Sequence, residues 1–368
     1  MNFACERDAL LRALDHAQRI VVRKDAVSIL ATVMIEVTEG RVTIRATNLD
    51  MLAETWCPAD VTTPGAGCVA LEPLFKLLQR LPAGAPVTAE AVWTAGHLAI
   101  RCRRSAVELP LLRPGEFPDF PLDADAAEIE IEGAVLARAM GVPLHAADPE
   151  DQRAFVQGVC VGPTSDGTHL LGIATNGRRI TRALLPLPAG AAAMPVVMVA
   201  VKPAEEIIRL ARSASTLRLR INDRLFSAEG EGARIVTKLL DARMPETRQH
   251  FPASLGRTVE ISAGDIADTL GRAEVLADDK YRAITLEVAD GELSLVSRST
   301  KGGAITDTIE VEGGDGIRFC ANVKMLREAL AAVGGDVVAI HHAGPGHPII
   351  VQAKGCDEIT ALVMPTVG

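Results

Sequence analysis

The chain has 368 residues, of which 48% are hydrophobic and 23% are charged, so it can bury sizeable cores and is not a disordered polypeptide. Its length exceeds that of one ordinary domain and predicts two or three domains. The net charge of -9 excludes a protein that coats nucleic acid with its whole surface, but it permits one basic surface within an acidic molecule.

The chain carries no pattern typical of secretion or of membrane insertion. Charges at Glu6, Arg7 and Asp8 stand where a signal peptide needs its apolar core. The longest apolar stretch, residues 189–201, is interrupted by Pro195 and is shorter than the roughly 20 residues that a membrane span needs. The 7 cysteines are scattered without a CxxC pair, which favours free thiols. We therefore expect a cytoplasmic protein with reduced cysteines and no membrane partner.

Three segments of the chain share one pattern of apolar residues. The stretch FACERDALLRAL, from residue 3, aligns without gaps with IEIEGAVLARAM, from residue 129, and with VEISAGDIADTL, from residue 259. The apolar period changes in each from near 2 to near 3.6, which predicts a short strand followed by an amphipathic helix. The matching apolar positions are Phe3, Cys5, Leu10 and Leu14, then Ile129, Ile131, Leu136 and Met140, then Val259, Ile261, Ile266 and Leu270. This self-similarity indicates an internal repeat.

The same order of elements continues in each copy. Some 30 residues further on, two predicted strands are joined by a glycine turn, and a second amphipathic helix and more alternating strands follow. The turn glycines are Gly40, Gly167 and Gly291, and the second helices are expected over residues 73–81, 202–211 and 322–333. The repeated order predicts three copies of one helix-and-strand unit.

Two stretches rich in Pro, Asp and Gly, residues 115–126 and 245–256, are typical of linkers between the copies. They give three domains, at residues 1–122, 127–250 and 257–368. The predicted fold class is α+β, with three tandem domains in which two helices pack on antiparallel sheet. The alternative is a chance likeness among generic segments, and the agreement in element order and spacing favours the repeat.

The predicted helices present basic residues on the face opposite their apolar stripe. In the first copy, Lys76 and Arg80 lie away from a stripe that contains Leu74 and Leu78. The other candidate cations are Arg12, Arg19, Arg23, Arg138, Lys202, Arg209, Arg212, Lys324 and Arg327. If strands of successive copies join into one sheet with the helices on one side, these cations would give sequence-independent contact with DNA phosphates. The alternative for any single residue is an ordinary solvated helix face.

Stretches throughout the chain resemble the bacterial sliding clamp, the beta subunit of DNA polymerase III. They are SILATVMIEVTEGRVTIRATNLDM from residue 28, LLRPGEFPDF from 111, ATNGRRI from 174, TKLLDARMPE from 237 and ALVMP from 361. The resemblance implies a head-to-tail homodimer whose domains form a ring around double-stranded DNA. It also implies partners: the DNA polymerase III alpha subunit, a clamp loader, and other polymerases and repair proteins. No catalytic residue, cofactor or metal is implied.

Residue roles follow from this resemblance where the motifs match. The pocket for partner peptides would lie between the second and third domains and would comprise Val156, Thr175, Gly177, Arg178, Arg179, Ile180, Pro245, Val363, Met364 and Pro365. The residues that face DNA would be Lys24, Arg80, Arg153 and Lys202. The dimer contact would pair Arg103, Val107 and Leu109 of one chain with Val275 and Leu276 of the other. The alternative for these last apolar residues is that they belong to the cores of their own domains.

The sequence departs from the family pattern at a few positions. Arg178 stands where the family commonly has histidine, and Ala154 and Phe155 replace what is often a pair of tyrosines. These changes leave pocket affinity and the identity of the partners open, and they also fit a diverged second copy of a clamp.

Two other classes of protein are alternatives. An enzyme or metalloprotein could use His341, His342 and His347 with Asp336, but this spacing matches no common zinc pattern and the intervening AGPGHP is typical of a turn. A repeat scaffold that binds a protein and never meets DNA is the second alternative. Retention on circular DNA distinguishes a clamp from both.

Overall fold

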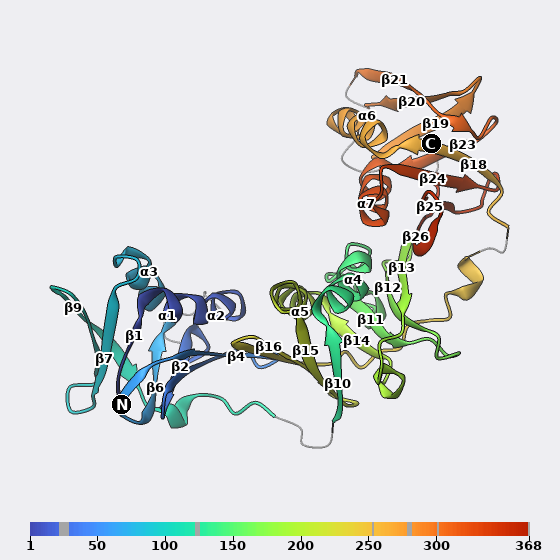
Figure 1. Cartoon of the computed structure of the whole chain (residues 1–368). Coiled ribbons are helices and arrows are strands. Elements are labelled where there is room, and N and C mark those ends of the chain that lie inside the picture. Colours follow the sequence, from blue (N-terminus) through green and yellow to red (C-terminus); the bar gives the residue numbers. More distant parts are fainter. Residues whose placement is uncertain (22–28, 122–125, 252–253, 278–281, 300–301, 367–368) are drawn as a thin grey trace. The chain divides into compact units, whose positions relative to one another are not determined.

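The computed structural model describes residues 1–21, 29–121, 126–251, 254–277, 282–299 and 302–366. The described chain alternates helices with antiparallel strands (Figure 1) and divides into two compact units. The first unit comprises residues 1–133 and 209–239, and the second comprises residues 134–208 and 240–368. This division cuts through the middle predicted domain, so the three boundaries expected from the sequence remain a prediction.

The first unit is built on one 13-stranded sheet, with the strand order β10-β15-β16-β17-β4-β3-β2-β6-β9-β8-β7-β1-β5. Its strands are β1 (Asn2–Glu6), β2 (Thr32–Thr38), β3 (Arg41–Thr47), β4 (Met51–Pro58), β5 (Asp60–Thr63), β6 (Gly65–Ala70), β7 (Pro86–Val92), β8 (His97–Cys102), β9 (Ser105–Leu112), β10 (Ala127–Glu132), β15 (Thr216–Ile221), β16 (Leu225–Gly230) and β17 (Ala233–Lys238). Its helices are α1 (Arg7–Ala13), α2 (Asp15–Ile20) and α3 (Leu71–Arg80), and α5 (Val201–Ser213) contributes residues to both units.

The predicted apolar stripes form the core of the first unit. The first helix expected from the sequence is divided at Leu14 into α1 and α2, yet Leu14 itself is completely buried and Phe3 is only 1% exposed. On α3 the buried stripe includes Leu74 and Leu78. Burial of a side chain of this size stabilises the fold by about 2 kcal/mol relative to its exposure. The strand-then-helix prediction is confirmed for this copy.

The second unit contains a nine-stranded sheet, with the order β14-β11-β12-β13-β26-β25-β24-β18-β22, and a four-stranded sheet, with the order β21-β20-β19-β23. Its strands are β11 (Gly158–Pro163), β12 (His169–Thr175), β13 (Arg179–Pro186), β14 (Val197–Ala200), β18 (Arg257–Ser262), β19 (Ala283–Ala289), β20 (Glu292–Arg298), β21 (Ala304–Glu310), β22 (Glu312–Gly313), β23 (Arg318–Asn322), β24 (Val337–His342), β25 (Ile349–Ala353) and β26 (Cys356–Val363). Its helices are α4 (Gly133–Leu144), α6 (Ala263–Leu276) and α7 (Val323–Val333).

Strands that belong to different predicted copies pair with one another. In the first unit β4 pairs antiparallel with β17, with Ala53 opposite Ile235. In the second unit β13 pairs in the same way with β26, with Ile180 opposite Leu362. The sequence-based suggestion that successive copies share a sheet is therefore confirmed within each unit.

The repeated turns are also confirmed. Gly40, Gly167 and Gly291 lie between β2 and β3, β11 and β12, and β19 and β20, with φ of 77°, 67° and 76°. These positive φ values favour glycine, because a side chain there would crowd the backbone.

The structure bears on the state of the cysteines and on membrane-spanning helices. All 7 cysteines are free, as predicted, and most of them are buried. Within the described ranges of the chain, no helix has the length and apolar character needed to cross a membrane.

Gly172 on β12 is a packing point that the fold cannot easily change. A Cβ added there would lie 1.7 Å from the Ala139 carbonyl oxygen of α4. We expect Gly172→Ala to destabilise the second unit by about 1–3 kcal/mol, because α4 must move away from the sheet. The control Gly271→Ala on α6, where the added methyl meets nothing within 4 Å, should be neutral or stabilising by up to about 1 kcal/mol. Urea denaturation followed by circular dichroism measures both effects, and equal midpoints for the two variants would contradict the prediction.

Candidate functional site

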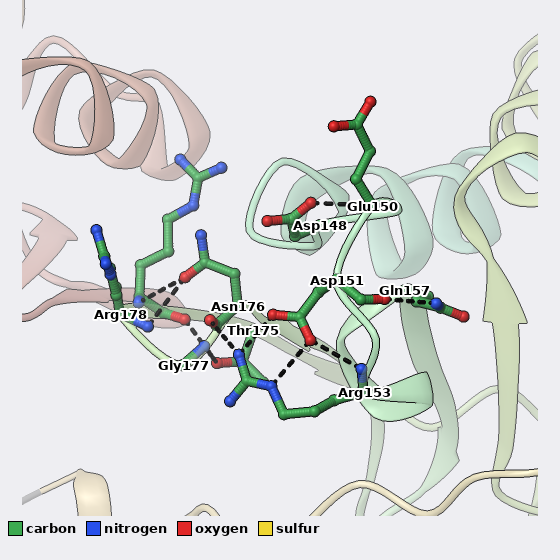
Figure 2. Close-up of polar contacts among 10 residues, drawn as sticks. Asp148, Glu150, Asp151, Arg153, Gln157, Thr175, Asn176, Gly177 and Arg178 are labelled. Carbon is green, nitrogen blue, oxygen red and sulfur yellow. Dashed lines mark hydrogen bonds and ion pairs between the residues drawn. The ribbon is translucent and has the colours of Figure 1, made fainter. Parts of the chain in front are cut away.

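A tight turn between β12 and β13 lies at the centre of the candidate site (Figure 2). The Thr175 hydroxyl donates to the Arg179 carbonyl at 2.7 Å and accepts from the Gly177 amide at 3.0 Å. The side-chain oxygen of Asn176 accepts from the amides of Arg178 and Arg179 at 3.0 and 3.1 Å. Gly177 has a φ of 84°, which favours glycine. Short polar side chains that bond to nearby amides therefore fold ATNGRR into this turn.

Sheet pairing brings the last strand of the chain to this turn. Arg179 lies opposite Val363, and Ile180 lies opposite Leu362. Beyond the ladder, the Met364 amide donates to the Arg178 carbonyl at 2.8 Å. The predicted pocket residues at 175–180 and 363–365 are therefore neighbours, although they are distant in the sequence.

An apolar cluster occupies one face of this sheet. Ile180 and Leu362 are buried there together with Cys160, Ile173 and Met198. The segment that follows β17 packs against the cluster through Leu240, Ala242, Met244 and Phe251. Because the five sheet residues are buried, only the partly buried members, such as Leu171, Met244 and Phe251, can offer apolar surface to a ligand.

A cavity of 570 Å³ opens over the same cluster. Ile173 and Leu184 line it from the sheet, and Pro245 and Phe251 line it from the segment that packs against the sheet. The Arg182 guanidinium lies 4.0 Å from the centre of the Phe251 ring, a cation–π contact that places a positive charge in the wall of the cavity.

The ten predicted pocket residues fall into two groups. Those with accessible side chains or backbone are Gly177, Arg178, Pro245, Met364 and, in part, Pro365. The buried ones are Val156, Thr175, Arg179, Ile180 and Val363. Only the first group can contact a ligand in this conformation, and the second group shapes the surface from beneath.

Arg179 has a structural role that the sequence did not reveal. It lies on the face of β13 opposite Ile180, because successive side chains of a strand alternate. Its guanidinium forms an ion pair with Glu328 on α7 and donates to the His145 carbonyl. The His145 ring meets the Thr181 hydroxyl at 2.9 Å. The place of Arg179 in the pocket remains a prediction, and in this structure its side chain fixes β13 to α7.

The surroundings of His145 keep its ring uncharged at neutral pH. Burial lowers the pKa of His145 to about 4, and the Arg179 cation lowers it further, against an opposing effect of Glu328. A neutral ring beside the Arg179–Glu328 pair leaves the net charge of this buried group near zero, which limits the desolvation penalty.

The residues predicted to face DNA differ in their environments. Arg80, at the end of α3, and Lys202, in the first turn of α5, are exposed. Arg153 is exposed too, but Asp151 accepts from its guanidinium at 2.8 and 3.0 Å, and the Asn176 carbonyl accepts at 3.1 Å (Figure 2). These bonds, with the Arg153 amide, lower the pKa of Asp151 to about 2. Arg153 thus supports the 175–179 turn.

Lys24, the fourth residue predicted to face DNA, lies outside the described residues. Several other predicted helix cations have acidic partners within their own unit. Lys76 lies 2.5 Å from Glu72, and Arg327 lies 2.9 Å from Glu274. Exposed pairs of this kind are weak, with a typical worth of about 0–1 kcal/mol, so these cations remain available to a stronger anion.

The residues predicted for a dimer contact differ in how exposed they are. Val275, near the end of α6, is 82% exposed, and its neighbour Leu276 is partly buried. Arg103 is exposed in the turn between β8 and β9. Leu109 is buried and Val107 partly buried in the core of the first unit, as the alternative reading expected. Val275 is therefore the residue of this set best placed for an intermolecular apolar contact.

The histidines considered as metal ligands have other contacts. His341 bonds to the Thr258 hydroxyl at 2.8 Å, and the His342 ring meets Phe319 edge-on with centroids 5.4 Å apart. In the part of the chain that the structure describes, no group of three or more His, Cys, Asp or Glu side chains is arranged to hold a metal ion.

Models of one protein family match the chain in three consecutive parts. The N-terminal domain of the DNA polymerase III beta subunit matches residues 1–121, the central domain matches residues 130–246, and the C-terminal domain matches residues 248–367. The three matches follow the order of the sequence repeat and leave few residues uncovered.

Full-length relatives show the same likeness. A beta sliding clamp from Caulobacter vibrioides is 27% identical over 369 residues, and one from Escherichia coli is 22% identical over 372 residues, each covering 99% of both chains. A solved DNA polymerase sliding clamp from Caulobacter crescentus is 26% identical, with a TM-score of 0.92 over 100% of both chains. A Pseudomonas aeruginosa clamp bound to griselimycin, 21% identical over 100% of both chains, shares the fold with a TM-score of 0.93.

The Arg179–Glu328 pair predicts an asymmetric response to mutation. Arg179→Met should lower the free energy of unfolding of the second unit by about 1–3 kcal/mol, because the partly buried Glu328 carboxylate would keep only the more distant Lys324, 3.9 Å away. Arg153→Met breaks an exposed pair and should cost about 0–1 kcal/mol. Urea denaturation of the two variants provides the comparison. Adding Glu328→Leu to Arg179→Met should recover part of the loss, and a further loss in that double variant would contradict the assignment.

Proposed function

Because the chain belongs to the DNA polymerase III beta subunit family, we propose that it is a sliding clamp, a non-catalytic processivity factor that encircles duplex DNA. The observation that carries this proposal is the match of three successive family domains, in order, to nearly the whole chain. A cytoplasmic location goes with the proposal.

The ring would be a head-to-tail homodimer of chains with domains at residues 1–122, 127–250 and 257–368. Two strand pairings between successive copies, β4 with β17 and β13 with β26, support this assembly. Each pairing joins the edges of two copies into one continuous ladder and removes two edges that would otherwise be open. A third junction of the same kind, between the first domain of one chain and the third domain of its partner, would close the ring.

DNA contact would be electrostatic and independent of sequence. The proposed contacts are Arg80, Lys202 and Lys24, with Arg153 close to the 175–179 turn. The overall charge of -9 limits nonspecific attraction, so a few cations gathered on the helices would give weak contacts that exchange with salt ions. Weak contacts of this kind permit sliding, and encirclement rather than affinity would then hold the protein on DNA.

Partner proteins would dock at the predicted pocket, whose exposed residues are Gly177, Arg178, Pro245 and Met364. Such partners are the DNA polymerase III alpha subunit, the clamp loader, and other polymerases and repair proteins. Each would present a short peptide with a hydrophobic anchor, and the cavity over the apolar cluster, lined by Leu171, Ile173 and Phe251, is apolar enough to take one. The Arg178 side chain extends from the turn (Figure 2) and would favour acidic residues beside that anchor.

Topological retention is the direct test of a ring. After loading by the cognate clamp loader onto nicked circular DNA, the protein should remain bound at salt concentrations that abolish electrostatic binding. Linearising the DNA should release it, because a ring slides off an end. Gel filtration of the protein–DNA complex before and after cleavage gives the measurement. Equal retention on both forms would show direct gripping and would exclude a sliding ring.

The exposed valine on α6 provides a test of the dimer contact. Val275→Asp should weaken the dimer at least about tenfold, because it places an unpaired charge in an apolar interface. Val196→Asp is the matched control, since Val196 is 58% exposed and lies outside the predicted interface. Sedimentation equilibrium of both variants gives their dissociation constants. An unchanged dimer in the Val275 variant would remove Val275 from the interface.

A further inference from the structure

A second cavity, of 900 Å³, lies in the second unit beside the end of β26. Arg257 at the start of β18 and Arg318 at the start of β23 line it, together with His342 at the end of β24. Pro365 and Thr366, which follow β26, also line it. Among the described residues that line this cavity there is no aspartate or glutamate. The lining is therefore cationic within an acidic protein.

Two polar atoms buried at this cavity have no hydrogen-bond partner among the described residues. His342 is only 4% exposed, and its Nδ1 atom is unpaired. The hydroxyl oxygen of Thr366 is likewise buried and unpaired. Buried polar groups nearly always have a partner, so two unpaired groups at one cavity indicate a ligand that supplies hydrogen-bonding atoms.

The two arginines are held at the cavity without a strong acidic partner. The Arg257 guanidinium donates to the Asp315 carbonyl at 2.9 Å and lies so close to Gly316 that a Cβ there would be 2.0 Å from Nη1. Arg318 is 69% exposed, and the Glu287 carboxylate lies 3.8 Å from its Nε atom. The charge of both guanidinium groups therefore remains available to an anion.

We propose that this cavity binds a carboxylate, the side chain of an aspartate or glutamate in the peptide segment with which a partner docks. This inference rests on the proposed function, since it assigns the acidic residue to the same partner segment. Pro365, in the cavity wall, follows Met364, which bonds to the Arg178 carbonyl of the turn. A segment anchored at that turn can therefore continue along the chain end into the cavity.

Two arginines supply enough positive charge to hold one carboxylate. The positive charge comes from two arginines at the cavity, whereas burial lowers the pKa of His342 and the nearby His347 lowers it further. The contact with the Pro348 carbonyl has the opposite, smaller effect. A carboxylate beside Nδ1 would favour the protonated ring over the neutral one, so binding would be linked to proton uptake. Binding should therefore weaken as the pH rises.

The test uses labelled peptides with two leucines as the apolar anchor and one aspartate, placed on either flank in turn, each compared with its asparagine counterpart. Fluorescence anisotropy with the full-length protein at about pH 6 should show ~10-fold tighter binding of the aspartate peptide for one flank. The preference should vanish in the double variant Arg257→Gln with Arg318→Gln. It should persist in Arg298→Gln, which removes an exposed arginine of β20 outside the cavity. It should also shrink at about pH 8.

Equal affinity of the aspartate and asparagine peptides on both flanks would overturn the inference, and so would a preference that survives in the double variant. Displacement of the aspartate peptide by inorganic phosphate but not by acetate would reassign the cavity to phosphate and would also overturn it. If no peptide binds while retention on circular DNA is intact, this inference fails and the proposed clamp function stands. Loss of that retention would instead count against the clamp function.

Discussion

Backbone pairing between distant strands is the constraint on which the rest of the second unit depends. The ladder between β13 and β26 sets Arg179 opposite Val363 and thereby decides which side chains surround the 175–179 turn. A slip of one residue would move Ile180 from the apolar cluster to the opposite face, because side chains alternate along a strand. The surface for partners exists only while this register holds. In the first unit, the ladder between β4 and β17 likewise fixes the register between strands of two predicted copies.

A buried polar contact reinforces that register from the other face of the sheet. Arg179 joins β13 to α7 through Glu328 and to the end of α4 through the His145 carbonyl. A buried arginine without these partners would be costly, so the geometry that pairs its two terminal nitrogens is strongly preferred, although its Nε atom has no partner among the described residues. Other positions of β13 would leave the buried guanidinium without these partners, and the penalty for that disfavours them. The exposed residues of the turn, Gly177 and Arg178, are then presented on a backbone that is fixed on both sides.

The distribution of charge fits a protein that holds DNA by topology. Pairs such as Lys76 with Glu72 leave the helix cations accessible, and they also prevent a dense basic surface from forming. The two arginines of the second cavity form a separate concentration of positive charge, in the wall beside Pro365. The helix cations would contact DNA as it slides past, and the two cavity arginines would hold the peptide of a bound partner. Both sets are exposed, and what separates them is position: the first lies on helices, and the second lines a cavity.

The sequence by itself determined the elements and their threefold order. Apolar periodicity places Phe3, Leu14 and Leu78 in a core, and glycine turns such as Gly40 need only their own neighbours to form. The Asn176 turn was encoded in the same local way. Only the tertiary structure decided that Arg179 lies beneath the surface with Glu328, 149 residues away, and that Arg153 binds Asp151 beside the turn. Local patterns specify local geometry, whereas the partner of a charged side chain depends on register and packing between distant segments, which no short stretch of sequence contains.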